Sequence, residues 1–307
     1  MATVLERWDS TSTDGESPAT TQERRRSATF VLWFSVPMAV LAIAGSLGGI
    51  FIDSIYSKET ENWASQAVAQ DIVNLAAFTG LLILAVFAVR GSLRAYLAWL
   101  GVVGYSAYTF ALYTFAVHFG PLFLVYVAVF GLSIFALIMG LVRLDFERVK
   151  ETFTARVPRR FASVLLLTIG GFFYLLWLSA VVSSSVSGEV PEDVVKAGLL
   201  TNPVHVIDMA VFLPAMLLAG ASLLQKRPIG YVLTPLVLGA AFTISLGIVV
   251  MQPVLEVRGE SPAWGIGVVI AIVAAVELVA LIRLLQAVRS GARVSSVVRA
   301  SDWTDNV

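Results

Sequence analysis

The segment 201–208 reads Thr-Asn-Pro-Val-His-Val-Ile-Asp and places one of the chain's two histidines three residues before an acid, at the start of an apolar stretch. At this spacing His205 and Asp208 share one face of a helix. Asn202 followed by Pro203 is the preferred order at a helix N-terminus, where asparagine caps free backbone N–H groups. An ionised acid that faces lipid is costly. We therefore expect a ligand, a hydrogen bond to His205 or a structural link to a neighbouring helix to compensate Asp208.

A second pair of polar residues, Asp71 and Asn74, has the same spacing on another apolar segment. Asp71 is expected either to cap the start of its helix, where a carboxylate benefits from free N–H groups, or to bind a ligand. One shift of the sequence against itself aligns six polar positions in pairs: Asp71 with His205, Asn74 with Asp208, and His118 with Gln252. Each pair falls at the same end of the predicted helices, so the six side chains could line one outward-facing pocket.

Two histidines and two aspartates are suitable ligands for Zn²⁺, Mn²⁺ or Fe²⁺, which bind imidazole nitrogen and carboxylate oxygen. The candidate metal ligands are Asp71, His118, His205 and Asp208. With one coordination position open, a divalent metal there would activate a water for hydrolysis of a lipid or another substrate at the outer leaflet. The sequence contains no HExxH or comparable motif. A metal-dependent membrane enzyme is therefore the second hypothesis.

The first hypothesis is that the same side chains bind a cation or a small polar solute, with transport of that ligand as its extension. Glu277 lies deep within an apolar segment, where an acid is a candidate proton carrier or cation ligand. The ligand-binding candidates are Asp71, Asn74, His118, His205, Asp208, Gln252 and Glu277. A third hypothesis is a non-catalytic scaffold whose polar groups only bind one another. Tyr105, Tyr108 and Tyr113 are interpreted as helix contacts, since hydroxyl-bearing side chains commonly join membrane helices.

The composition places these residues in a bilayer. Of 307 residues, 58% are hydrophobic and 14% are charged, and the mean hydropathy is +0.84, outside the usual balance of a water-soluble domain. The 21 basic and 21 acidic residues give a formal net charge of zero, so the chain has no excess of positive charge that would attract nucleic acid. The absence of cysteine excludes disulfides, thiolate metal sites and thiol redox chemistry. The expected environment is a lipid bilayer, and no nucleic-acid partner is expected.

Eight apolar stretches are long enough to cross about 30 Å of hydrocarbon as helices. They cover residues 29–52, 71–89, 95–117, 122–142, 161–186, 204–224, 229–251 and 263–285. The shift that aligns the polar pairs also aligns the first four spans with the last four. Because four crossings return the chain to its starting side, the halves would share one orientation, as in transporters built from parallel repeats. The expected fold is an all-α bundle of eight transmembrane helices in two parallel four-helix repeats.

The predicted domain boundaries follow from this repeat and from the polar ends of the chain. They are a disordered cytoplasmic tail at 1–26, repeats at 27–150 and 151–287, and a cytoplasmic tail at 288–307. Lys and Arg gather in the connections on one side, and such residues stay in the cytoplasm. Both termini are therefore predicted to be cytoplasmic, in a prokaryotic plasma membrane. A cleaved signal peptide is the alternative for the N-terminus, although the first apolar run is longer than an ordinary signal.

Three segments resemble an uncharacterised family of prokaryotic multi-pass membrane proteins. They are Gln-Asp-Ile-Val-Asn-Leu at 70–75, Arg-Gly-Ser at 90–92, and the segment 201–208. The resemblance would cover most of residues 29–251 and implies a multi-pass membrane protein. It supplies no catalytic residue, ligand or partner, so the function must be argued from the residues themselves.

Overall fold

The chain folds as an all-α bundle of membrane-spanning length. The computed structural model describes residues 18–299, with side chains from Phe30 onward. Within these residues, eight helices are long and apolar enough to cross a membrane, and no strand forms beyond isolated bridges. The predicted all-α bundle with eight spans is confirmed, and the chain is a multi-pass integral membrane protein.

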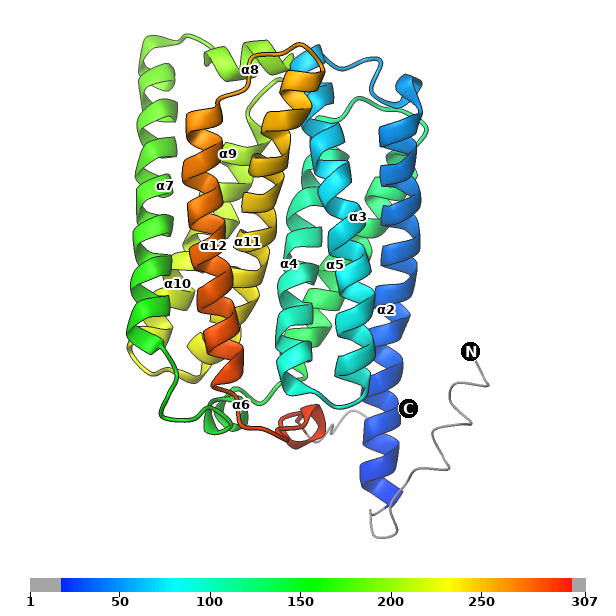
Figure 1. The fold of residues 1–307 in the computed structure, drawn as a ribbon, viewed down its shortest axis with the longest axis vertical. Helices are drawn as coiled ribbons and strands as arrows, with labels where there is room; N and C mark the ends of the chain where they lie inside the picture. Colours follow the sequence, from blue (N-terminus) through cyan, green and yellow to red (C-terminus); the bar gives the residue numbers. More distant parts are fainter. Residues whose placement is uncertain (1–17, 300–307) are drawn as a thin grey trace.

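The helices run back and forth along the long axis of the bundle (Figure 1). The long helices are α2 (Pro18–Phe51), α3 (Glu61–Val89), α4 (Leu93–Ala116), α5 (Phe123–Val142), α7 (Arg159–Ser187), α10 (Leu213–Leu224), α11 (Pro228–Val257) and α12 (Trp264–Gln286). The sixth span, Pro203–Leu224, joins α9 (Pro203–Ile207), the π-helical turn η2 (Asp208–Phe212) and α10. The short helices are η1 (Asp53–Ile55), α6 (Phe146–Glu151), α8 (Glu192–Ala197) and η3 (Val294–Ser296).

Polar side chains fix the starts of several helices. Asn202 accepts hydrogen bonds from the backbone N–H groups of Val204 and His205 at 2.9 and 3.1 Å, which confirms the cap predicted from the Asn-Pro order. Ser92 caps α4 in the same way, through the N–H of Ala95. These caps satisfy N–H groups that a helix leaves free in its first turn.

The start of α3 corrects the sequence prediction. The second span was expected at 71–89, but the helix begins at Glu61 and is capped by Thr60. Asp71 therefore lies about 15 Å inside the helix at 1.5 Å per residue, and it does not cap the helix start. The first turns of α3 mix the polar residues Glu61, Asn62 and Gln66 with mostly small apolar residues, so a hydropathy pattern places the start of the helix too late.

The end of α11 also lies beyond its predicted position at residue 251. This helix has 30 residues and ends at Val257, which corresponds to about 45 Å at 1.5 Å per residue and exceeds the roughly 30 Å hydrocarbon core. Gln252 consequently lies within the helix. A helix that extends beyond the hydrocarbon contains polar residues that a hydropathy window leaves out.

The helices α4 and α11 form the centre of the bundle. Within their apolar windows, 78% of α4 and 67% of α11 is buried, against 11% of α7. The two helices pack so closely that a Cβ atom on Gly101 would lie 3.0 Å from the Cα of Gly239. Small residues at such a contact let two membrane helices approach each other.

The packing pairs of the first four spans recur in the last four. The pairs α2–α3, α3–α4, α4–α5 and α2–α5 are in contact in the first half. Their counterparts α7–α10, α10–α11, α11–α12 and α7–α12 are in contact in the second half. This is the pattern that two parallel repeats at 27–150 and 151–287 would produce, and the repeat itself stays a prediction.

The structure describes part of each predicted tail. Helix α2 begins at Pro18, so residues 18–26 are helical where a disordered tail was expected, while residues 1–17 lie outside the described residues. The segment 288–299 packs across the end of the bundle that carries α6, which we call the α6 end. Isolated bridges hold it there, pairing Ser92 with Arg293, Leu144 with Val298, and Phe153 with Val288.

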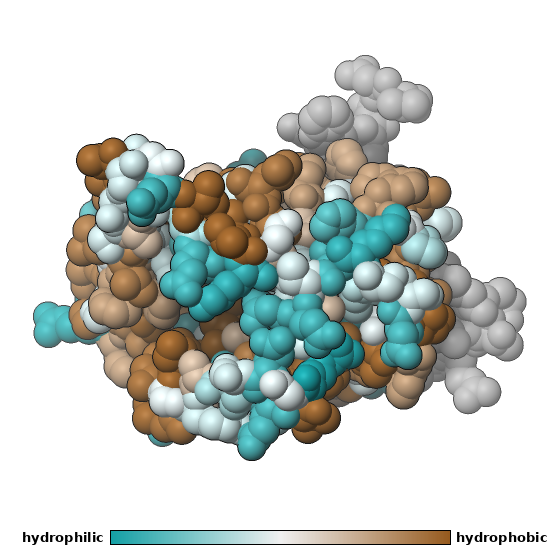
Figure 2. Space-filling view, turned by 90° about the horizontal axis from the view of Figure 1, so that it is seen from above, coloured by the Kyte–Doolittle hydropathy of each residue, from teal (hydrophilic) through white to brown (hydrophobic). Residues whose placement is uncertain are grey.

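The opposite end of the bundle carries α8, and we call it the α8 end. Its connections lie at 52–60, 117–122, 188–202 and 258–263. Figure 2 views this end and shows hydrophilic residues over its middle, with apolar residues along much of the edge. This distribution fits a bundle whose sides face hydrocarbon and whose end faces water.

Candidate functional site

Asp71 is the acceptor of two tyrosine hydroxyls in the half of the bundle nearer the α8 end. Tyr56, which follows η1, donates to Oδ2 at 2.7 Å, and Tyr113 on α4 donates to Oδ1 at 2.9 Å. The side chain is buried, with 1% of the residue exposed. Burial and the adjacent Asp71 carboxylate raise the pKa of Tyr56 well above its usual range, so its hydroxyl stays protonated and donates. Both carboxylate oxygens thus accept a hydrogen bond, which suits an acceptor-only ionised group.

A glycine on α2 makes room for this arrangement. A Cβ atom on Gly49 would lie 2.1 Å from Oδ2 of Asp71 and 2.7 Å from the hydroxyl of Tyr56. Any larger residue at this position would therefore push the carboxylate or the phenol out of place. The close approach of α2 to α3 depends on the missing side chain.

Asn74 continues the network along α3. Its amide nitrogen donates to the hydroxyl of Ser46 on α2 at 3.1 Å, and its amide oxygen accepts from Tyr105 on α4 at 2.6 Å. Gln70 in turn donates to the hydroxyl of Tyr105. The polar groups of α2, α3 and α4 are thus joined in one buried network.

Asp208 is held in a comparable way in the second half of the chain. Tyr108 on α4 donates to Oδ1 at 3.0 Å, and the indole N–H of Trp177 on α7 donates to Oδ2 at 2.8 Å. Asp208 begins the π-helical turn η2. Pro214 follows this turn and lacks the N–H that would bond to Ala210. Such turns interrupt α-helices at functional sites more often than elsewhere.

His205 stacks on Trp177, with ring centroids 4.3 Å apart. It is buried, and it lines a separate cavity of about 370 Å³ between α7 and α9. Within the described residues, no hydrogen bond joins the side chains of His205 and Asp208, so the structural bond considered for this pair is not formed. Only the backbone N–H of Asp208 donates to the carbonyl of His205. The histidine supports the tryptophan ring that holds Asp208.

A pocket of about 330 Å³ lies between α3, α4, α7, α9, α11 and α12, and we call it the aromatic pocket. Its aromatic lining residues are Trp63, Tyr108, Tyr113, Phe173 and Trp177. Two glutamine side chains of α3 and aliphatic residues of α11 and α12 complete its wall. Three of the aromatic residues, Tyr108, Tyr113 and Trp177, donate hydrogen bonds to the two buried acids. One carboxylate therefore lies behind Tyr113, and the other lies behind Tyr108 and Trp177.

The two acids have no basic partner in the part of the chain that the structure describes. The ion pairs found there join other residues, and none includes Asp71 or Asp208. A buried carboxylate is ordinarily paired with a cation or bound by several donors. Here each has two neutral donors and no cation of the described residues beside it.

Three other candidates lie away from this pocket. His118 is half-exposed and binds Glu59 through Nδ1 at 2.9 Å, which ties the connection before α3 to the end of α4. Gln252 accepts from the backbone N–H of Ala263 at 2.8 Å and fixes the connection into α12. Glu277 is buried and accepts a hydrogen bond from Ser245 at 2.9 Å, and neither Glu277 nor Ser245 lines the pocket.

The candidate metal ligands do not meet at one point. Between residues 30 and 299, no group of three or more His, Asp or Glu side chains is arranged to hold a metal ion. Asp71 and Asp208 lie behind different aromatic side chains, His118 binds Glu59, and His205 faces its own cavity. The arrangement instead offers two acids and an aromatic wall.

Sequence reasoning missed the aromatic donors of the site. Tyr108 and Tyr113 were interpreted as helix contacts, and Trp177 and Tyr56 were not singled out. The available signal was the density of tyrosines on α4, the most buried of the spans. A tyrosine hydroxyl in a buried membrane helix needs an acceptor, and the two acids supply one each.

No family model, curated protein or solved structure matches this chain. The resemblance of segments 70–75, 90–92 and 201–208 to a family of prokaryotic membrane proteins therefore stays a prediction. The function must be argued from the aromatic pocket itself.

Proposed function

We propose that this membrane protein binds an organic cation in the aromatic pocket and transports it. The observation that carries the proposal is that two buried acids without a basic partner lie directly behind the aromatic wall of the pocket. A cation over an aromatic face gains about 0.5 to 2 kcal/mol from the ring quadrupole, with the larger gain when it is desolvated. The chemical class of the ligand is an ammonium with an apolar body.

The mostly apolar lining selects the kind of cation. Ligand pockets are commonly apolar with a few polar groups that orient the ligand, and here Gln66 and Gln70 are the polar groups on α3. A small metal ion would have to exchange its water ligands for contacts with aromatic and aliphatic side chains, which is unfavourable. An organic ammonium carries less water and fits such a wall, while an anion would be repelled by the acids.

The position of the pocket supports transport as the use of this binding. Its wall includes α3 and α4 from the first half and α7, α9, α11 and α12 from the second. Transporters built from repeats hold their substrates at the interface of the repeats. Tyr108, Tyr113 and Trp177 line the pocket and donate to Asp71 or Asp208, whereas Ser245, the donor to Glu277, does not line it. We therefore assign the binding step to Asp71 and Asp208.

The orientation follows from basic residues at the ends of the spans. The connections at the α8 end hold only Lys58, Lys196 and Arg258, whereas the other Lys and Arg residues from 90 to 299 lie at the α6 end. Positive residues are retained in the cytoplasm. We therefore infer cytoplasmic termini and an outward-facing α8 end, in a prokaryotic plasma membrane.

The test compares one cation with an anion of similar shape. Isothermal titration calorimetry with the purified full chain would use benzyltrimethylammonium and phenylmethanesulfonate, which share a benzyl group and carry opposite charges. The proposal expects the ammonium to bind and the sulfonate to show no measurable binding. Equal binding of the two compounds would show that the charge of the acids does not act on the pocket.

Asp208→Asn is the variant that removes charge without disturbing the fold. The indole N–H of Trp177 can only donate, so the amide oxygen faces it, while the amide N–H₂ donates to Tyr108, whose hydroxyl also accepts. At a separation of roughly 7 Å and an effective dielectric constant of about 20, the lost attraction is about 2 kcal/mol. Ammonium binding should weaken about thirtyfold.

Glu277→Gln is the matched control, because it neutralises another buried acid whose hydrogen-bond donor, Ser245, does not line the pocket. Its hydrogen bond from Ser245 can be kept, since a glutamine oxygen accepts as well. The ammonium affinity should change by less than about threefold. If Glu277→Gln weakens binding as much as Asp208→Asn, the assignment of the cation to this pocket is wrong.

A further inference from the structure

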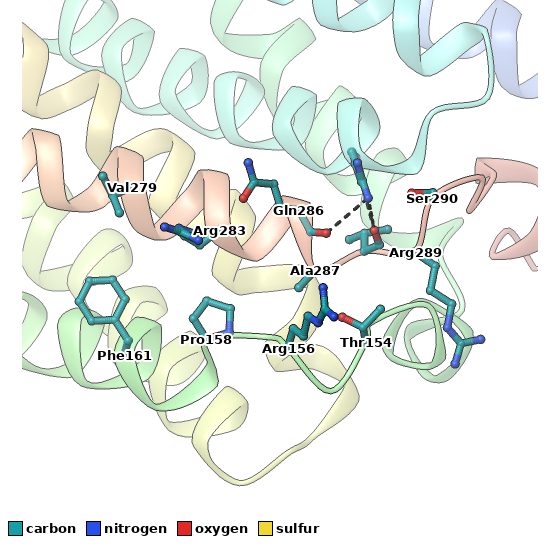
Figure 3. Close-up of a pocket in the computed structure, with 12 residues that line it drawn as sticks. Thr154, Arg156, Pro158, Phe161, Val279, Arg283, Gln286, Ala287, Arg289 and Ser290 are labelled. Atoms are coloured by element: carbon teal, nitrogen blue, oxygen red, sulfur yellow. Dashed lines mark hydrogen bonds between the residues drawn. The ribbon is translucent and has the colours of Figure 1, made fainter.

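A third cavity, of about 700 Å³, lies at the α6 end between the start of α7 and the end of α12, and we call it the basic groove. None of its lining residues is acidic, and four of them are arginines: Arg94, Arg156, Arg283 and Arg289. In Figure 3, Arg156 reaches from the connection before α7 toward the end of α12, the helix that carries Arg283. The groove is therefore a concentrated positive site at the edge of the bundle.

Two of the acids at this end form ion pairs outside the basic groove, and a third, Glu151, does not line the groove. Asp145 binds Arg148 at 3.4 Å, and Glu147 binds Lys150 at 3.2 Å. Arg94 donates to the backbone carbonyl of Val288 at 3.1 Å, which fixes the segment after α12.

The other three arginines keep their hydrogen-bonding capacity. Within the described residues, no ion pair or hydrogen bond engages the side chains of Arg156, Arg283 and Arg289. A guanidinium has five N–H donors in a planar fork that matches phosphate oxygens. Three such groups around one cavity are suited to a phosphate anion.

The start of α7 adds further donors to the basic groove. The helix begins at Arg159 after Pro158, and no side chain caps it. The N–H of Arg159 donates to the carbonyl of Val157 at 2.8 Å, whereas the next N–H groups of the first turn have no side-chain cap. Pro158 and Phe161, at this start of the helix, line the groove. A helix N-terminus next to arginines favours a negative group.

The apolar wall of the basic groove distinguishes a lipid from a free phosphate. Phe161 on α7 and Val279 on α12 line the groove and are 47% and 51% exposed. Val164 and Ile282 continue this exposed apolar surface along the same helices. Exposed apolar residues on membrane spans face hydrocarbon, so the groove opens sideways to the acyl chains of the bilayer.

We propose that the basic groove binds the phosphate headgroup of an anionic phospholipid, with the acyl chains lying against α7 and α12. Basic pockets beside transmembrane helices bind such headgroups, and each Lys or Arg near the surface contributes about fivefold to binding. A soluble phosphate ester shares the same anionic group but would leave the apolar wall unused. The site is separate from the aromatic pocket, and its test does not depend on cation binding.

Native mass spectrometry of the full chain tests the proposal. The delipidated protein would be titrated with phosphatidylglycerol and with phosphatidylcholine of the same acyl chains. Phosphatidylglycerol is expected to bind at least about tenfold more tightly than phosphatidylcholine. Equal binding of the two lipids would overturn the proposal, because arginine donors should distinguish a net negative headgroup from a zwitterionic one.

The variant pair Arg156→Gln with Arg283→Gln should weaken phosphatidylglycerol binding by about tenfold or more. Arg227→Gln is the matched control, since it removes one exposed charge from the same end of the bundle outside the groove and should leave binding within about twofold. If the pair does not fold, Arg156→Gln alone changes an exposed connection and should weaken binding about fivefold. A loss in Arg227→Gln equal to that in the groove variants would refute the site.

Glycerol 3-phosphate separates the two sources of a phosphate group. It carries the anionic group without acyl chains, so the proposal expects it to bind at least about tenfold more weakly than phosphatidylglycerol. If it binds as tightly as the lipid, the ligand of the groove is a soluble phosphate ester, and the lipid assignment is wrong.

Discussion

Gly49→Ala tests whether the carboxylate of Asp71 is held as tightly as the structure shows. The added Cβ would lie 2.1 Å from Oδ2 of Asp71 and 2.7 Å from the hydroxyl of Tyr56. Asp71 cannot simply turn aside, because Tyr113 holds its other oxygen. Loss of one hydrogen bond to a charged group costs about 1.5 to 3 kcal/mol, and overpacking costs about 1 to 3 kcal/mol. We expect a destabilisation of about 2 to 4 kcal/mol.

The assay is reversible unfolding of the purified chain in mixed micelles, followed by circular dichroism. Gly48→Ala is the matched control one residue earlier, because its Cβ would lie 3.7 Å from Leu122, an ordinary contact. The control should change stability by less than about 1 kcal/mol. In a Tyr56→Phe background, Gly49→Ala should cost at least about 1 kcal/mol less, since the two changes share one contact. A Gly49→Ala protein as stable as Gly48→Ala would refute the tight Asp71–Tyr56 arrangement.

Two further predictions concern α4. Tyr108→Phe removes one of the two donors to Asp208 and should destabilise the chain by about 1 to 3 kcal/mol, as measured by the same unfolding assay; an unchanged stability would show that this bond contributes nothing. Gly101→Ala would bring a Cβ within 3.0 Å of the Cα of Gly239 and should destabilise by about 1 to 3 kcal/mol. Gly131→Ala on α5 has no atom within 4 Å of its added Cβ and should be nearly neutral, so equal losses in both glycine variants would contradict the close α4–α11 contact.

The sequence predicted the architecture because apolar length is a strong signal in a membrane protein. Each of the eight expected spans corresponds to an observed helix. The errors lie where helices extend beyond hydrocarbon, as at Glu61 and Val257, since water-exposed turns need no apolar residues. The Asn202 cap was predicted because its bonds are local to two or three residues.

The candidate site was predicted only in part, because its contacts join distant segments. Asp71 and Asp208 were identified since an acid in an apolar run is conspicuous. Their donors could not be assigned, because nothing in the spacing of Tyr108 or Trp177 shows which acid each meets across the bundle. The pairing of His118 with Glu59 was missed for the same reason, and it explains why this histidine lies outside the pocket.

The central claim is that the aromatic pocket holds a cation in front of the two acids. A crystal structure with 4-iodobenzyltrimethylammonium, located by anomalous scattering of iodine, tests it most directly. The proposal predicts one iodine peak inside the pocket, with the ammonium against Tyr108, Tyr113 and Trp177. An iodine peak only on the lipid-facing surface, or in the cavity lined by His205, would contradict it.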